Sequence, residues 1–329
     1  MHCRTKSYNC GFRSVCIFLF FIFILLCVLA GGCASDKTSS KSRFMENASA
    51  GKKDKLRDAV PVVFVPKASG KVTYGNGDIL IDASNTANGY VMLKYTGTNE
   101  KVKFQIKTPE AVEYTYLVTE PGEYSVYPLS GGNGSYRFTL LESVSIEDNM
   151  YAVAFTQSME ITIADEFSPY LYPNHYVDFS EGSAAVAKGQ ELAEKCTCDL
   201  EVVSNIYNYV ISSISYDTSK AESVAYGYTP DVDETLKSGK GICFDYAALM
   251  AAMLRSQQIP TKLEVGYAGE AYHAWISCYV EEVGWVDNII EFDGKNWSLM
   301  DPTLAANNDR DYVREYIGDG SGYVIKYTY

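Results

Sequence analysis

The sequence predicts an α+β protein, in which an all-β, sandwich-like domain at residues 59–166 precedes a domain of mixed helices and strands at residues 167–329. In the first region, short segments alternate apolar and polar side chains and are separated by turn residues, as half-buried strands are. After Pro169 and Pro173 the apolar residues recur at helical spacing. Alternating segments return beyond Pro260, so the second domain combines both kinds of element.

The first domain has seven or eight expected strands, a number typical of an antiparallel sandwich. They run over residues 79–81, 90–95, 102–106, 114–118, 124–127, 136–141, 151–155 and 159–163. No catalytic cluster occurs among them. Their many tyrosines suit the half-buried face of a strand, and binding of glycan or peptide by exposed tyrosines is the alternative interpretation.

Helices are expected in the second domain wherever apolar residues form one stripe at helical spacing. These segments cover residues 183–195, residues 199–214 with Asp199 as a cap, and residues 309–317; a terminal strand is expected at residues 323–329. The stripe in the second of these helices is interpreted as core.

Cys243 has the surroundings of a catalytic thiol. A thiol becomes a good nucleophile as a thiolate, which a helix amino terminus and a neighbouring imidazolium stabilise. Gly239 and Gly241 precede it, and residues 246–255 contain strong helix formers without a breaker until Pro260. The sulfur is therefore expected in the first helical turn, where unpaired N–H groups and the helix dipole favour an anion.

His273 is the candidate base. Of the other two histidines, His2 lies in a segment expected to be removed, and His175 lies among turn residues. His273 opens an alternating segment, residues 274–280, which predicts a strand and hence a rigid support.

Asp301 is the candidate third member of a triad. It ends an expected strand at residues 296–300, and Pro302 stops the ladder there. On a strand beside that of His273, its carboxylate would fix the tautomer and orientation of the imidazole. Each residue alone has an ordinary structural interpretation, but Gly-x-Gly-x-Cys, His-Ala-Trp and Asp-Pro-Thr together favour catalysis.

From about Asp199 to Pro302, these motifs and the order of expected elements resemble the transglutaminase-like superfamily of papain-like thiol enzymes. The resemblance implies an α+β papain-like catalytic domain, with Cys243 as nucleophile, His273 as base and Asp301 as its orienting acid. It also suggests Tyr216, at the end of the preceding helix, as a second oxyanion donor beside the N–H of Cys243.

One departure from the resemblance is an insertion after Gly284-Trp285-Val286. It is interpreted as an extra hairpin turning at Asp293-Gly294. The insertion leaves Asp287 as an alternative triad acid, although Asp301 is preferred for its Pro-Thr context. Trp275, beside the base, either walls the cleft or fills the core.

The amino terminus resembles a bacterial lipoprotein signal at residues 1–32. Arg4, Lys6 and Arg13 precede a continuous apolar run at residues 15–30, which is short for a membrane span and suitable for a signal peptide. Cleavage before Cys33 with lipid on its sulfur is the expectation, and an uncleaved anchor is the alternative. Either way, the remainder is expected outside the cytoplasmic membrane, behind a flexible, polar tether at residues 33–58.

The net charge of −13 makes nucleic acid an unfavourable partner, because an acidic chain repels phosphate backbones. After signal removal and lipidation, the remaining cysteines would be Cys196, Cys198, Cys243 and Cys278. Free thiols are expected, with a disulfide from Cys278 to one of the first two as the alternative. No metal or other cofactor is expected, because there is no calcium loop and no His pair at ligand spacing.

The sequence therefore predicts a surface-anchored thiol enzyme that acts on peptide or protein amides, cell-wall peptides among them, through a thioester. Hydrolysis is favoured because the domain has no evident means of excluding water. Protein crosslinking by a transglutaminase reaction is one alternative, and an inactive domain that binds cell wall or protein is another. Substrate identity and oligomeric state stay open.

Overall fold

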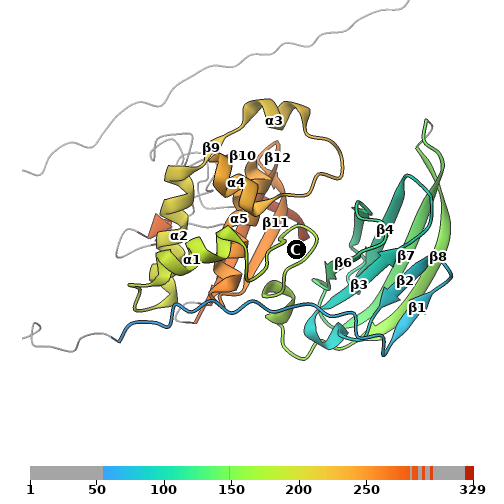
Figure 1. Ribbon diagram of the computed structural model, residues 1–329, viewed down its shortest axis with the longest axis horizontal. Helices are drawn as coiled ribbons and strands as arrows, with labels where there is room; N and C mark the ends of the chain where they lie inside the picture. The colour runs from blue at the N-terminus through green and yellow to red at the C-terminus, as the bar shows by residue number, and fades with distance from the viewer. Residues whose placement is uncertain (1–54, 148, 282–283, 288–290, 293–296, 299–322) are drawn as a thin grey trace, which may run out of the picture. The chain divides into compact units, whose positions relative to one another are not determined.

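The computed structural model describes residues 55–147, 149–281, 284–287, 291–292, 297–298 and 323–329, with only the backbone at 291–292 and 297–298. The expected signal segment, the lipidation site Cys33, most of the tether, Asp301 and the helix at 309–317 lie outside these residues. Residues 54–329 form one compact unit. The α+β class is confirmed (Figure 1).

The first domain consists of two four-stranded antiparallel sheets. One has the order β1-β2-β3-β6 and the other β5-β4-β7-β8. Their bounds are Thr73–Gly75 (β1), Ile79–Asp82 (β2), Tyr90–Tyr95 (β3), Val102–Lys107 (β4), Glu113–Leu117 (β5), Tyr124–Pro128 (β6), Gly134–Ser145 (β7) and Met150–Ile161 (β8). A 3-10 turn, η1 (Thr86–Asn88), lies between β2 and β3.

The two sheets pack face to face through aromatic side chains. The ring of Tyr127 on β6 lies 4.9 Å from that of Phe104 on β4 and 4.7 Å from that of Tyr116 on β5, between centroids. All three side chains are buried, so these tyrosines are core residues, as the packing interpretation predicted. The strand pattern is confirmed except at β1, which was not predicted, and at β8, where one continuous strand replaces the two predicted. It pairs along β7 through two bulges, and as an edge strand it tolerates the polar residues at its centre.

The second domain places helices against an antiparallel sheet of order β13-β12-β11-β16. Its helices are α1 (Ala184–Ala193), α2 (Asp199–Ser213), α3 (Thr218–Ser223), α4 (Val232–Ser238) and α5 (Cys243–Ser256), after a 3-10 turn η2 (Ser168–Tyr170). Its strands are β9 (Ser215–Tyr216), β10 (Lys240–Gly241), β11 (Thr261–Ala268), β12 (Ala271–Val280), β13 (Gly284–Val286), β14 (Glu291–Phe292), β15 (Trp297–Ser298) and β16 (Tyr323–Thr328). The antiparallel pair β14–β15 agrees with the hairpin expected for the insertion. It forms a separate two-stranded sheet, so the described part of the strand that leads to Asp301 does not pair with β12, in contrast to the expectation.

Helix α5 is the centre of this domain and contacts α1, α2, α4, β11 and β12 (Figure 1). Every residue from Asp245 to Ser256 is buried. At its carboxyl end, the fully buried Arg255 donates to the carbonyl oxygens of Thr261, Tyr172 and Tyr329. The guanidinium thus links the end of α5 to three other segments of the chain.

Aromatic contacts also join the sandwich to the second domain. Tyr114 and Tyr116 on β5 pack against Tyr329, with ring centroids 5.5 and 5.9 Å apart. The last residues of the expected tether also contact the second domain, since Arg57 forms an ion pair with Asp199 of α2 at 2.5 Å. The domain boundary near residue 167 stays a prediction.

His175 lies inside this aromatic cluster, 5.4 Å from Tyr127 and 5.6 Å from Tyr116 between ring centroids. Its Nε2 is buried and finds no hydrogen-bond partner among the described residues. Burial lowers the pKa of His175 from 6.5 to about 4. It is therefore a neutral, half-buried residue of the aromatic cluster, in agreement with its rejection as the base.

We predict that His175→Phe makes the protein less sensitive to acid. Between pH 6.5 and 4 the unfolded chain binds a proton at His175 that the folded chain does not, so the stability of the native protein falls as the pH falls. From pH 7 to pH 4, the free energy of unfolding should therefore fall by about 3 kcal/mol less in the variant than in the native protein. Urea unfolding across this range measures it, and parallel pH profiles would contradict the prediction.

Candidate active site

Cys243 is the first residue of α5, as predicted. Ile242 before it has extended backbone, φ −97° and ψ 175°, which ends the preceding loop and starts the helix. Cys243 and Phe244 are half-buried, whereas the residues that follow are buried. The sulfur thus stands at the amino terminus of an otherwise enclosed helix, where helical N–H groups lack intrahelical acceptors.

The two glycines before Cys243 have separate structural roles. Gly239 caps α4 in the left-handed conformation, φ 64°, and its N–H donates to Thr235. Gly241 allows a close approach, since a Cβ there would lie 2.7 Å from the Cβ of Asp245. Asp245 can therefore fold back against the loop that leads into the helix.

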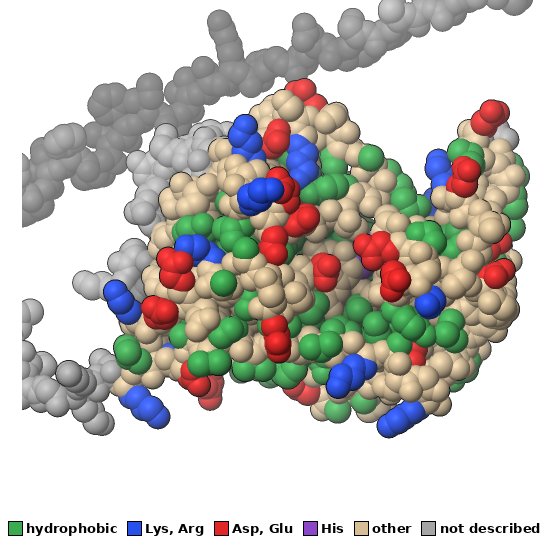
Figure 2. All heavy atoms as spheres, in the orientation of Figure 1, with side chains coloured by type: hydrophobic (Ala, Val, Ile, Leu, Met, Phe, Trp, Pro, Cys, Tyr) green, Lys and Arg blue, Asp and Glu red, His purple; other side chains and the backbone are tan. Residues whose placement is uncertain are grey.

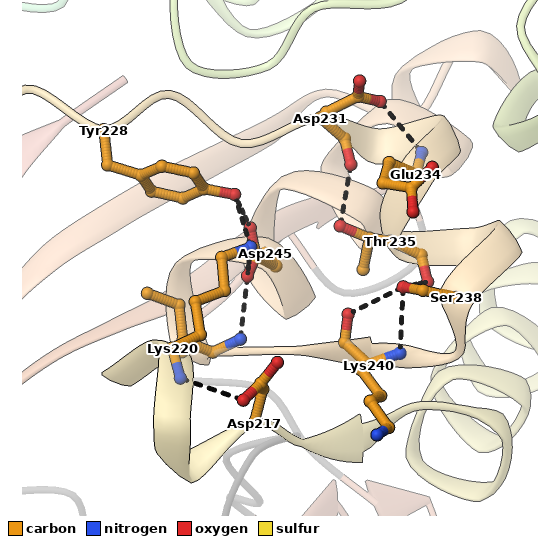
Figure 3. Close-up of polar contacts among 10 residues, drawn as sticks. Asp217, Lys220, Tyr228, Asp231, Glu234, Thr235, Ser238, Lys240 and Asp245 are labelled. Atoms are coloured by element: carbon orange, nitrogen blue, oxygen red, sulfur yellow. Dashed lines mark hydrogen bonds and ion pairs between the residues drawn. The ribbon is translucent and has the colours of Figure 1, made fainter. Parts of the chain in front are cut away.

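The Asp245 carboxylate is fully buried and accepts three hydrogen bonds (Figure 3). The N–H of Ile242 donates to its Oδ2 at 2.8 Å, Lys220 Nζ donates to the same oxygen at 2.7 Å, and the Tyr228 hydroxyl donates to Oδ1 at 2.5 Å. Lys220 Nζ also donates to the Tyr228 oxygen at 2.6 Å. One carboxylate thus holds both the start of α5 and the segment that follows α3.

Asp245, Lys220 and Tyr228 belong to no motif that the sequence pattern singled out. An acidic residue at the third position of a helix is a known capping signal. The capping of the start of α5 by Asp245 could therefore have been predicted from the sequence. Its partners lie 25 and 17 residues upstream, and no local pattern connects them.

Cys243 and His273 line the same pocket, of about 400 Å³. His273 is the third residue of β12 and pairs with Gly266 of β11, so the sheet supports it as expected. Tyr216 lines the pocket too. It lies on β9, which pairs in parallel with β10 just before Cys243. The structure therefore brings together three of the predicted site residues from separate elements.

Trp275 lies near His273 on β12, with ring centroids 6.4 Å apart, but it is enclosed by the protein. It is 1% exposed and is not among the residues that line this pocket. Its indole N–H donates to Glu264 Oε2 at 2.9 Å, and Ser277 donates to the same oxygen at 2.7 Å. Burial raises the pKa of the Glu264 carboxyl. Of the two interpretations offered for Trp275, this placement favours the core.

The register of β13 on β12 bears on the choice of triad acid. Val286 pairs with Cys278, and extending the register sets Asp287 opposite Ser277. Four residues of strand separate Ser277 from His273, or about 13 Å, which is beyond the reach of an Asp side chain. Asp287 instead contributes to the raised pKa of Glu264, whose carboxylate accepts from Ser277.

All four cysteines of the described chain are free. Cys196 and Cys278 are buried, Cys198 and Cys243 half-buried. Burial raises the pKa of the Cys278 thiol and that of Cys196. A disulfide between Cys278 and either Cys196 or Cys198 is therefore not formed in this structure.

Two further observations concern only the described residues. They contain no group of three or more His, Cys, Asp or Glu side chains placed to hold a metal ion. None of their helices has both the length and the apolar character needed to cross a membrane.

Residues 186–288 match the family model of the transglutaminase-like superfamily. This stretch runs from α1 past β13 and includes Cys243 and His273, while Asp301 lies beyond it. The resemblance inferred from the motifs is thus confirmed, and this part of the chain is a transglutaminase-like domain.

Two curated proteins are similar to the chain. A UPF0252 protein of Methanocaldococcus jannaschii is 27% identical over 140 residues, which cover 36% of this chain and 39% of that protein. An uncharacterised protein of Mycobacterium leprae is 26% identical over 184 residues, which cover 56% of this chain and 61% of that protein. The chain therefore spans less than two thirds of the length of either relative.

Similar solved structures include a candidate cysteine protease from Cytophaga hutchinsonii, at 16% identity and a TM-score of 0.34, covering 64% of this chain and 68% of that one. The periplasmic domain of TgpA from Pseudomonas aeruginosa has 14% identity and a TM-score of 0.31, with coverage of 70% and 94%. Red sea bream transglutaminase has 14% identity and a TM-score of 0.27, with coverage of 66% and 48%. At values this low, these likenesses carry no argument about activity.

We predict that Asp245→Ala lowers the free energy of unfolding by about 3–5 kcal/mol, because it leaves Lys220 Nζ and two neighbouring donors without their buried acceptor. Asp231→Ala is the matched control, since it removes only the capping bond to Glu234 N of α4 and should cost about 1 kcal/mol. Urea unfolding compares the two variants. Equal losses would mean that the buried network contributes no more than an ordinary cap.

Proposed function

We propose that this chain is a thiol enzyme that acts on peptide or protein amides through a thioester acyl-enzyme, with Cys243 as nucleophile and His273 as base. The observation that carries the proposal is that Cys243, at the first position of α5, opens onto the same pocket as His273. A transglutaminase-like domain over residues 186–288 supports this reaction class.

In the proposed first step, the Cys243 thiolate attacks the carbonyl carbon of the amide. The N–H of Cys243 and the Tyr216 hydroxyl donate to the oxyanion that forms. When the C–N bond breaks, the His273 imidazolium gives its proton to the leaving amine, and the acyl group stays on sulfur. Water then attacks the thioester while His273 takes a proton from it, and the C–S bond breaks to release the acid and return the thiolate.

Asp301 is proposed to orient the imidazole of His273. The register that sets Asp287 opposite Ser277 supports this choice, since it places the alternative acid about 13 Å along the strand from the base. The Pro-Thr sequence after Asp301 matches the motif expected of the family.

Hydrolysis is the proposed outcome because the pocket is open to water. Two of the residues that line it, Tyr226 and Tyr272, are 72% and 60% exposed. An amine acceptor would instead give a crosslink, and a binding module without turnover is the alternative from a different class.

We place this activity on the outer face of a bacterial cell membrane, with the chain anchored by lipid on Cys33. The motif of the first 33 residues supports this location. Peptides of the cell wall or of neighbouring proteins are then the substrates within reach.

We predict that iodoacetamide alkylates Cys243 at least about tenfold faster than Cys198 at pH 6, because an imidazolium beside the thiol favours the thiolate. Cys198 is an internal control, since it is also half-buried and also stands at a helix start, as the N-cap of α2. In His273→Ala, Cys243 should slow to the rate of Cys198. Mass spectrometry of each cysteine peptide gives the rates, and an unchanged Cys243 rate in the variant would remove the ion pair from the mechanism.

We predict that Asp301→Ala reduces acylation of Cys243 far more than Asp287→Ala. Loss of the orienting acid costs about 10⁴ in turnover in a serine protease triad, whereas Asp287 lies opposite Ser277 rather than His273. The rate of thioester formation with an activated acyl donor, measured by intact mass, distinguishes the two variants. If Asp287→Ala were the inactive one, the strand that ends at Val286 would carry the acid.

A further inference from the structure

We propose that the pocket beside Cys243 selects acyl donors with an uncharged aromatic or branched aliphatic side chain, and that strand β5 of the sandwich forms one wall of this subsite. The inference rests on the proposed function and names its substrate class. It also gives the sandwich a direct part in substrate recognition.

Among the described residues, the lining of this pocket contains no Asp, Glu, Lys or Arg. Apart from Cys243 and His273, the side chains are apolar, aromatic or hydroxyl-bearing, with Leu117, Val224, Ile242 and Phe244 among them. A charged side chain that entered would exchange part of its hydration for this lining, where the described residues offer no carboxylate, ammonium or guanidinium as a partner, which is costly. An uncharged, largely apolar side chain loses no comparable hydration free energy, and burial of its apolar surface stabilises the complex.

This neutrality is specific to the pocket. The chain carries a net charge of −13, and acidic side chains spread across the middle of the face shown in Figure 2. A second pocket, of about 490 Å³, is lined by five carboxylates: Glu120, Asp178, Glu181, Asp231 and Asp233. Burial and the acidic neighbours raise the pKa of Asp178 there. The lining beside Cys243 therefore differs from that of the second pocket in its charge, the property that decides which side chain can enter.

Strand β5 reaches the pocket through alternate residues. Tyr114 and Tyr116 are buried in the aromatic core, so Thr115 and Leu117 face the other way and line the pocket. Gly227 packs directly on this strand, because a Cβ at that position would lie 2.7 Å from Leu117 Cδ2. The wall formed by β5 is thus held between the core and the segment that follows α3.

The adjoining wall, residues 224–228, is held in place by the buried carboxylate of Asp245. Its hydrogen bond from Tyr228 fixes the end of residues 224–228, all of which line the pocket (Figure 3). A volume of about 400 Å³ lies within the range of small-ligand pockets. It suits one large side chain with its amide rather than a folded protein surface. The exposed rings of Tyr226 and Tyr272 supply aromatic faces on which an entering ring can stack.

The test compares three small electrophiles on the full mature chain: chloroacetamide, N-phenethyl chloroacetamide and N-chloroacetyl-β-alanine, which carries a carboxylate. Alkylation of Cys243 by the phenethyl compound should be at least about tenfold faster than by the carboxylate compound, a difference that one unpaired buried charge readily exceeds. At Cys198, which lies outside the pocket, the two rates should be similar. Equal rates at Cys243 would overturn the proposed substrate class.

Two matched variants test the wall formed by β5. Thr115→Lys adds a cation to the pocket and should raise the ratio of carboxylate to phenethyl rates at least about tenfold. Thr139→Lys is its control, since Thr139 lies in the same cross-strand row two strands away, about 10 Å from Thr115, and does not line the pocket. Equal ratios in the two variants would remove β5 from the subsite.

Chloroacetamide separates this inference from the proposed function. If it alkylates Cys243 no faster than Cys198 at pH 6, the proposed thiolate mechanism fails. If Cys243 is the faster thiol but does not distinguish the phenethyl from the carboxylate compound, the mechanism stands and the substrate class is wrong.

Discussion

The arrangement of the candidate site depends on one buried carboxylate, that of Asp245. It lies in the first turn of α5 and accepts from the N–H of Ile242, from Lys220 and from Tyr228. A buried charge is stable only when it is paired and hydrogen-bonded. The buried carboxylate of Asp245 therefore requires these donors. Because Ile242 immediately precedes Cys243, the same interaction fixes the loop that presents the thiol and the segment that lines the pocket.

A second constraint is the aromatic interior that joins the sandwich to the transglutaminase-like domain. Tyr116, Tyr127, Tyr176 and Tyr329 meet edge to face or stacked, and His175 completes the cluster as a neutral ring. Such contacts are directional, so they specify how β5 lies against the second domain. The strand thereby gains two faces, one that belongs to the core and one that belongs to the pocket.

Charge is distributed unevenly over this acidic chain. Five carboxylates line one pocket, while no described carboxylate lines the pocket with Cys243 and His273. Within the second domain, Glu264 is kept off that lining and accepts from Trp275 and Ser277 instead. The thiol and the imidazole therefore face described side chains that are apolar, aromatic or hydroxyl-bearing.

Local patterns were sufficient for the elements that carry Cys243 and His273. A glycine-flanked start followed by strong helix formers determined that α5 begins at Cys243, and alternation determined that His273 lies on a strand, because helix capping and strand pleating act over a few neighbouring residues. Only the tertiary structure decided that Lys220 and Tyr228 pair with Asp245, that Trp275 bonds to Glu264 away from the pocket, and that Thr115 and Leu117 line it. These contacts join residues far apart in the sequence, and they form only when side-chain packing brings separate elements together, which no local periodicity encodes.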